Sequence, residues 1–334
     1  MIRSLTTKSN LVLIVLFLLL LQTSHVLGES DCGMQYGAWH PTDDLFAISC
    51  NNVVSIYTTG FQLVKILPSP LEPDMTAPEV TALAWSPNGL YLAAAITRAD
   101  APGGDGSASR LVVWEVSSGN LLLNIPQFEY PIAWSPDSKL IATNSLTRDG
   151  LYFYDIVTGS EVSHCFECPG EAMAWNPTDI HQFIVSQGQR ILFLDPLASS
   201  SPSPEIVKGI AMLFRNGGYS PDGTRIVVYE TQVSQLKIID SYTKHTIATL
   251  PYRITGTVKD YQWLQDGIYI SKADGGVLRW NGTSEPEVLL ATVDTSAYWK
   301  PDGTKYLVSN RDGSFVRDTA TGAIISQRLI EDLP

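Results

Sequence analysis

The sequence predicts an all-β fold, a seven-bladed β-propeller with four antiparallel strands in each blade. Two observations lead to this prediction. A short motif centred on an aromatic residue occurs seven times at intervals of 36 to 49 residues, and six copies continue with a polar residue and a proline. Turn signals and short apolar segments follow each copy, and no long amphipathic helical pattern competes with them.

The aromatic residues of the motif define the repeat. Six of the eight tryptophans fall at this one position, which scattered core aromatics would not do. We expect each of these residues to end the innermost strand of a blade and to pack between neighbouring blades. These anchors are Trp39, Trp85, Trp134, Trp175, Tyr219, Trp263 and Trp299.

The segments after each anchor predict the remaining strands of a blade. In the third repeat, Pro136-Asp137-Ser138 is typical of a turn, and residues 140–144 and 151–155 are rich in residues suited to a buried strand. The fourth strand is short, as in residues 121–125 of the second repeat. The first repeat starts at its innermost strand and the last ends at its outermost. No N-terminal strand is left to complete the seventh blade, so we expect other contacts to join the first and seventh blades and close the ring.

The N-terminus has the layout of a signal peptide. Arg3 and Lys8 precede an apolar run of eleven residues, 11–21, which is shorter than the roughly 20 residues of a membrane span. We expect residues 1–28 to be removed after Gly28 and residues 29–334 to form a single propeller domain. We therefore expect the mature chain to be secreted or transferred to the periplasm and to have no membrane span after cleavage. The alternative is an uncleaved anchor.

The mature chain is acidic. Without Arg3 and Lys8 it has 20 basic and 34 acidic residues, a net charge of −14. Such a chain is a poor partner for nucleic acid. Residues 29–178 hold 17 carboxylates and five basic residues, whereas residues 179–334 hold 17 and 15, so one side of the ring should be the more negative.

The third repeat also resembles a known family. Residues 133–142 read Ala-Trp-Ser-Pro-Asp-Ser-Lys-Leu-Ile-Ala, and residues 154–159 read Tyr-Asp-Ile-Val-Thr-Gly. This resembles a bacterial-type WD40 repeat, and the resemblance extends from Gly33 to Leu329. No Gly-His pair opens the repeats, and the Trp-Asp ending occurs only as variants such as Trp114-Glu115. The resemblance implies the fold and leaves the function open.

Four cysteines in an exported chain favour disulfides. Cys32 and Cys50 should lie on adjacent strands, within the roughly 4.4 to 6.8 Å between Cα atoms that a bridge requires. The alternative is a buried thiol at Cys50. Cys165 and Cys168 form a CxxC beside His164, for which we expect a structural disulfide; redox or metal-binding chemistry is the alternative.

The sequence contains no Gly-x-Ser-x-Gly elbow and no His-Glu-x-x-His motif. We therefore expect a binding scaffold that needs no cofactor, because propeller loops present variable surfaces on a rigid frame. The alternative is a lactonase-like or phytase-like hydrolase that holds a divalent cation at one mouth of the channel. Its carboxylates would precede the innermost strands: Asp31, Glu79, Glu129, Glu171, Asp260 and Asp294.

The predicted binding surface is a face of long acidic loops. Residues 68–79 and 98–110 exceed turn length and should project from the same face. We expect a cationic protein or peptide to bind there, with the acidic residues speeding its association. An acidic surface that only aids solubility is the alternative. The residues of this acidic loop face are Glu72, Asp74, Glu79, Asp100 and Asp105.

Overall fold

The structure is a computed structural model. It describes residues 34, 36–50, 53–68, 78–98, 109–145, 150–198, 205–208, 218–230, 235–250, 258–272, 276–283, 285–290, 297–310 and 312–329. The predicted signal peptide, residues 1–28, lies outside these ranges. Within them, no helix is long and apolar enough to cross a membrane.

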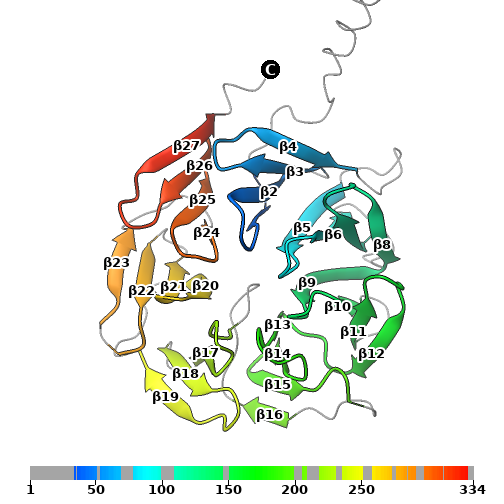
Figure 1. Cartoon of the computed structure of the whole chain (residues 1–334). Coiled ribbons are helices and arrows are strands. Elements are labelled where there is room, and N and C mark those ends of the chain that lie inside the picture. Colours follow the sequence, from blue (N-terminus) through cyan, green and yellow to red (C-terminus); the bar gives the residue numbers. More distant parts are fainter. Residues whose placement is uncertain are drawn as a thin grey trace, which may run out of the picture.

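Seven antiparallel sheets surround a central channel, which confirms the predicted propeller (Figure 1). Each sheet is built from strands consecutive in the sequence, and in the six four-stranded sheets the first strand lies nearest the channel. The first three blades comprise β1 (Tyr36–Trp39), β2 (Leu45–Cys50), β3 (Val53–Thr58) and β4 (Leu63–Leu67); β5 (Pro78–Trp85), β6 (Tyr91–Arg98), β7 (Arg110–Glu115) and β8 (Leu121–Pro126); and β9 (Phe128–Trp134), β10 (Leu140–Ser145), β11 (Gly150–Asp155) and β12 (Glu161–Phe166).

The remaining four blades follow the same order. They comprise β13 (Ala172–Trp175), β14 (Phe183–Gln187), β15 (Arg190–Leu194) and β16 (Glu205–Lys208); β17 (Arg225–Glu230), β18 (Gln235–Asp240) and β19 (Thr246–Thr249); β20 (Val258–Leu264), β21 (Gly267–Lys272), β22 (Val277–Trp280) and β23 (Glu287–Leu290); and β24 (Tyr298–Trp299), β25 (Lys305–Ser309), β26 (Gly313–Asp318) and β27 (Ile324–Leu329). In the fifth blade, a bridge from Tyr219 to Ile226 marks the innermost strand position.

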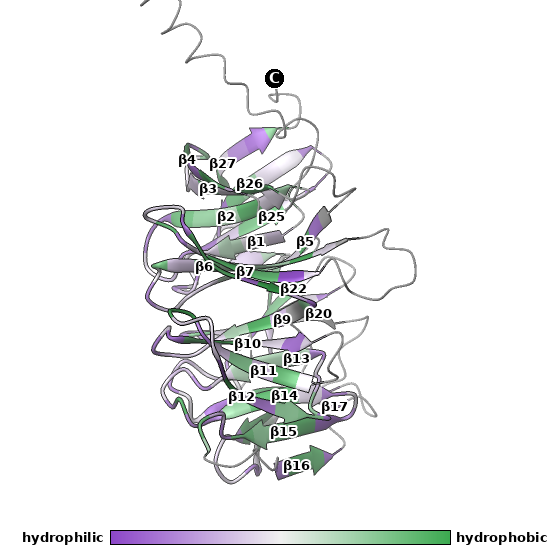
Figure 2. Ribbon diagram, turned by 90° about the vertical axis from the view of Figure 1, so that its right-hand side faces the viewer, coloured by the Kyte–Doolittle hydropathy of each residue, from purple (hydrophilic) through white to green (hydrophobic). Residues whose placement is uncertain are grey.

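The hydrophobic core lies between blades. Every residue of β10 is buried, whereas most residues of the outermost strand β27 are exposed or half-buried. In Figure 2, β2 and β15 are accordingly drawn largely in hydrophobic colours and β27 in hydrophilic ones. The anchors pack across blade boundaries, as expected: the ring of Trp134 stacks on Tyr91 of the preceding blade, with centroids 6.1 Å apart.

Side chains close the ring between the seventh and first blades, since each of these blades has its own four consecutive strands. The indole of Trp39 donates to the carbonyl oxygen of Tyr298 at 2.8 Å. At the outer strands, the Arg328 guanidinium donates to the Tyr57 hydroxyl at 2.7 Å and also lies over its ring. These side-chain contacts join the first and seventh blades and close the ring, as the sequence led us to expect.

Candidate functional site

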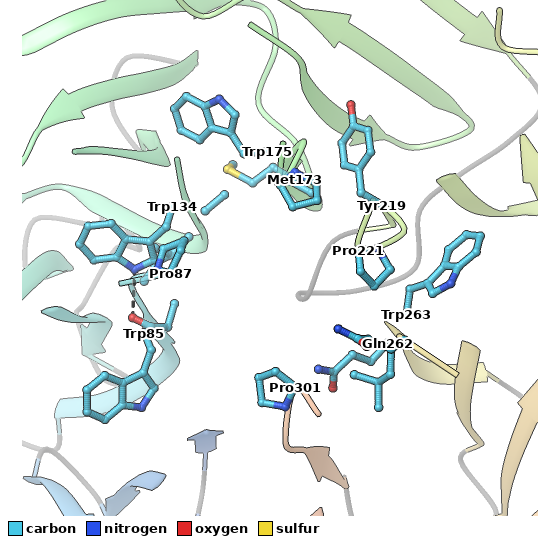
Figure 3. Close-up of a pocket in the computed structure, with 17 residues that line it drawn as sticks. Trp85, Pro87, Trp134, Met173, Trp175, Tyr219, Pro221, Gln262, Trp263 and Pro301 are labelled. Carbon is cyan, nitrogen blue, oxygen red and sulfur yellow. Dashed lines mark hydrogen bonds between the residues drawn. The ribbon is translucent and has the colours of Figure 1, made fainter. Parts of the chain in front are cut away.

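The inner strands end around a hollow of about 470 Å³, which we call the central hollow (Figure 3). Equivalent residues of successive blades line it, because each blade brings its anchor motif to the same radius. The lining includes the tryptophans Trp85, Trp134, Trp175 and Trp263, the prolines Pro87, Pro177, Pro221 and Pro301, and the amides Gln262 and Gln265.

The tryptophan rings point away from the opening, whereas the prolines lie around it. In Figure 3, Pro87, Pro221 and Pro301 border the opening, and the rings of Trp175 and Trp263 extend outward toward the blades. Trp134 and Trp175 are only 8% and 6% exposed. The hollow therefore presents proline rings, indole edges and amides, and the bulk of each indole stabilises the blade interfaces.

A repeated hydrogen bond fixes the anchors. The indole nitrogen of Trp85 donates to the carbonyl oxygen of Ala38 at 3.1 Å, and that of Trp134 donates to Ala84 at 3.0 Å. In each case the acceptor directly precedes the anchor of the preceding blade. Trp175 departs from this pattern because its indole donates within its own blade, to Ile180 at 2.8 Å.

The residue after the anchor fixes the turn that borders the hollow. Where it is serine, it caps its own turn. The Ser220 hydroxyl donates to the Asp222 carboxylate and accepts a bond from the backbone of Arg225. The bond from Ser220, followed by those from Thr224, lowers the pKa of Asp222 to about 2.

Longer residues at this position reach the turn of the next blade. His40 lies 3.2 Å from the carbonyl oxygen of Gly89, and the Asn176 amide donates to Gly223 at 2.9 Å. The Lys300 ammonium lies 2.9 Å from the Asp44 carboxylate across the ring closure. His40 thus joins two blades in addition to accepting a hydrogen bond from the backbone of Asp43 in its own turn.

The described lining of the central hollow offers apolar and amide contacts. Among the described residues that line it, Tyr219 is the only titratable side chain, and burial raises the pKa of this phenol far above its usual value. The glutamines offer amide donors and acceptors beside apolar surface, which is the usual make-up of a recognition site. The sequence signal for this hollow was the shared position of the anchor prolines, which we had interpreted only as turn formers.

Of the six carboxylates predicted to hold a cation, the structure describes the side chains of two, and neither lines the central hollow. Glu79 is exposed, at the opposite end of β5 from Trp85, and Glu171 is exposed directly before β13. Asp31 and Asp294 lie outside the described residues, and for Glu129 and Asp260 only the backbone is described. Within the described part of the chain, no three His, Cys, Asp or Glu side chains are grouped to hold a metal ion. Nothing here supports the hydrolase alternative.

We had expected these carboxylates to precede the innermost strands, but three of them lie within those strands. Glu79, Glu129 and Asp260 lie within β5, β9 and β20. Each of these inner strands pairs with its neighbour through a shift in register. A β-bulge adds residues to one strand without adding partners, so the inner strands begin earlier than the hydrophobic pattern indicated.

Most of the predicted acidic loop face is not described. Glu72, Asp74, Asp100 and Asp105 lie outside the described residues, and Glu79 is exposed. The binding role of these five carboxylates therefore stays a prediction.

The CxxC segment forms a disulfide. Cys165 and Cys168 are bonded, with Cα atoms 5.5 Å apart, and both residues are buried against the core between the third and fourth blades. His164 lies 2.7 Å from the carboxylate of Glu161. Burial keeps this disulfide from exchange partners, which favours a structural role. Cys50 is also disulfide-bonded, and its predicted partner Cys32 lies outside the described residues.

Comparison with known proteins identifies the fold. No protein-family model matches the chain, and no curated protein matches it. The C-terminal WD40 domain of Sif2 is similar, with a TM-score of 0.61, 19% identity and coverage of 86% of this chain and 81% of that one. The β-propeller domain of Cps50 (Swd1) from Myceliophteria thermophila has a TM-score of 0.58, 12% identity and coverage of 75% and 86%.

A chain in a crystal structure of a mitotic checkpoint complex is also similar, with a TM-score of 0.58, 14% identity and coverage of 84% of this chain and 92% of that one. At such low identity these likenesses show the fold alone. The chain is thus a seven-bladed propeller similar to WD40 domains.

Proposed function

We propose that this chain is an exported scaffold that binds a protein or peptide partner, and that the central hollow is its main contact site. The observation that supports this most is the lining of the hollow, which combines prolines, indole edges and two glutamines on a rigid ring. Such a surface can bury a partner's side chain and bond its backbone amides. The similar structures include the WD40 domain of Sif2 and a chain in a mitotic checkpoint complex, and they agree with this role.

The acidic loop face is the second part of the proposal. We assign the binding of a cationic segment to Glu72, Asp74, Glu79, Asp100 and Asp105; of these, Glu79 is described and is exposed. A cationic partner would associate faster in their field, and salt would weaken the effect. We also assign the chain to the bacterial-type WD40 group, on the Ser-Pro-Asp turns of its third and fifth repeats.

Site-directed photo-cross-linking tests the scaffold. A photoreactive residue is placed at Gln265, which is exposed in the hollow, at Glu79 on the opposite face, or at Val162 on the outer strand β12. The proposal expects a discrete adduct from Gln265 or Glu79 in the chain's native compartment, and none from Val162. Equal adducts from all three positions, or none from any, would contradict it.

Association kinetics test the acidic face separately. Once a partner is identified, the triple change Glu72→Lys, Asp74→Lys and Asp100→Lys should slow its association, and Glu285→Lys should not. Equal effects, or association indifferent to salt, would remove this assignment and leave the hollow as the contact site. A stoichiometric divalent cation in the purified protein would instead revive the hydrolase alternative.

A further inference from the structure

The turn between β22 and β23 contains the sequence Asn281-Gly282-Thr283. It joins the two outermost strands of the sixth blade. Asn281 and Thr283 are exposed, and so is Glu285 just beyond them. A group attached to Asn281 would therefore project from the rim of the ring without entering the core.

The local geometry couples the asparagine amide to the threonine. Both the backbone N–H and the hydroxyl of Thr283 donate to the Asn281 side-chain oxygen, at 3.0 and 3.1 Å. Gly282 between them has a φ of +88°, which a residue with a side chain rarely adopts. This turn holds the hydroxyl against the amide, and the middle residue is not proline, as the Asn-x-Ser/Thr acceptor pattern requires.

A second Asn-x-Thr in the chain shows what the pattern excludes. Asn176-Pro177-Thr178 has proline in the middle. Its asparagine is buried, and its amide donates to Gln182 and Gly223 in the turns around the hollow. Modification there would break the contact between two blades. Only the exposed copy can accept a large group without disturbing the fold.

The disulfides supply an independent observation about compartment. The described part of the chain has no free cysteine: Cys165 is bonded to Cys168, and Cys50 is also disulfide-bonded. Disulfides persist in the oxidising compartments through which exported chains pass. In a eukaryotic cell, the first of these compartments is also where Asn-x-Ser/Thr acceptors are glycosylated.

We propose that Asn281 is the acceptor of an N-linked oligosaccharide. The Asn281 amide nitrogen forms a bond to the anomeric carbon of an oligosaccharide carried on a lipid pyrophosphate. The bond from that carbon to the pyrophosphate oxygen breaks, the lipid pyrophosphate leaves, and one amide proton passes to a base. The glycan then stands beside β23, where Val288 is 64% exposed, and covers apolar rim surface while the hollow stays open.

This inference rests on the export included in the proposed function, and one experiment separates the two. The full chain is translated with eukaryotic microsomes and assayed for protection from added protease and for a mass increase that a glycan-releasing amidase removes. We expect protected chain with one glycan. The increase should vanish in Asn281→Gln and Thr283→Val and remain in Thr283→Ser and in Asn88→Gln, a control outside the acceptor pattern.

The other possible results distinguish a failure of glycosylation at Asn281 from a failure of export. Protected wild-type chain without the increase would overturn the glycosylation and leave export standing. Chain that protease digests would overturn export, and glycosylation with it. An increase that persists in Asn281→Gln would place the glycan elsewhere and overturn the assignment to this residue.

Discussion

The indole nitrogen of Trp39 donates a hydrogen bond to the carbonyl oxygen of Tyr298, 259 residues away, at 2.8 Å. The same bond joins the second blade to the first through Trp85 and the third to the second through Trp134. The ring is thus closed by the interaction that holds consecutive blades together, here acting between distant parts of the chain.

The first prediction concerns this closing bond. Trp39→Phe keeps an aromatic ring but removes the indole N–H that donates to the carbonyl oxygen of Tyr298, so it should lower the free energy of unfolding by about 1 to 3 kcal/mol. Trp134→Phe is the matched control, because it removes the same bond between blades that the chain already connects. Urea unfolding and limited proteolysis measure both. If Trp39→Phe does not make the first and seventh blades more susceptible to protease than Trp134→Phe does, the closure described here is wrong.

The second prediction concerns pH. The Lys300 ammonium, 9% exposed, lies 2.7 Å from Asp302 and 2.9 Å from Asp44. Hydrogen bonds from Lys300 and Lys305 lower the pKa of Asp44. At Asp302, burial acts to raise the pKa, but the hydrogen bonds from Lys300 and Thr304 together outweigh it and lower the pKa. Because the pKa values of Asp44 and Asp302 are lower in the folded chain than in the unfolded chain, these carboxylates stabilise the fold at pH values above the unfolded pKa of about 4. This stabilisation is lost as the pH falls from there through the folded pKa values.

The measurement is the free energy of unfolding between pH 7 and pH 2.5. The wild type should lose more stability on acidification than Lys300→Met, which lacks the shared cation. Lys139→Met is the control, because that ammonium is largely exposed and its contact with Asp137 is long, at 3.7 Å. Parallel curves for the wild type and Lys300→Met would show that the ion pair does not stabilise the closure.

The sequence was sufficient to predict the anchors and turns, because each depends on a local pattern. Trp134, Ser135, Pro136 and Asp137 are consecutive in the sequence, and the repetition of this motif predicted the blades. The reach of His40 to Gly89 depends instead on how closely two turns approach after the ring has closed. The central hollow is missing from the prediction for the same reason: its lining comes from several blades.

The third prediction tests the turn-to-turn contacts. Gly223 has a φ of +72°, and a Cβ there would lie 2.2 Å from the Asn176 side-chain oxygen. Gly188 also has a positive φ, +57°, but a Cβ there meets nothing within 4 Å. Alanine at either position causes backbone strain of about 1 to 3 kcal/mol. Gly223→Ala should therefore lower the unfolding free energy more than Gly188→Ala does, and the difference measures the contact between blades. Equal losses in thermal unfolding would contradict that contact.

The fourth prediction concerns the disulfide of Cys165 and Cys168. Because the bridge closes a very short loop, replacing both residues by serine should cost about 2 kcal/mol of unfolding free energy, less than for a long loop. Non-reducing peptide mapping should find Cys165 linked to Cys168. Linkage of either cysteine to Cys50 would contradict the assignment, and so would a free thiol at either position.

The most direct test of the scaffold is the affinity of a partner, identified by cross-linking, for variants of the central hollow. Gln265→Trp places a large ring in the hollow of about 470 Å³. Val162→Trp places the same ring on the exposed outer strand β12. Calorimetry should show that Gln265→Trp raises the Kd at least about tenfold, a loss of roughly 1.4 kcal/mol in binding free energy. Val162→Trp should leave the Kd unchanged. Unchanged binding by Gln265→Trp, with its unfolding curve intact, would contradict the hollow as the contact site.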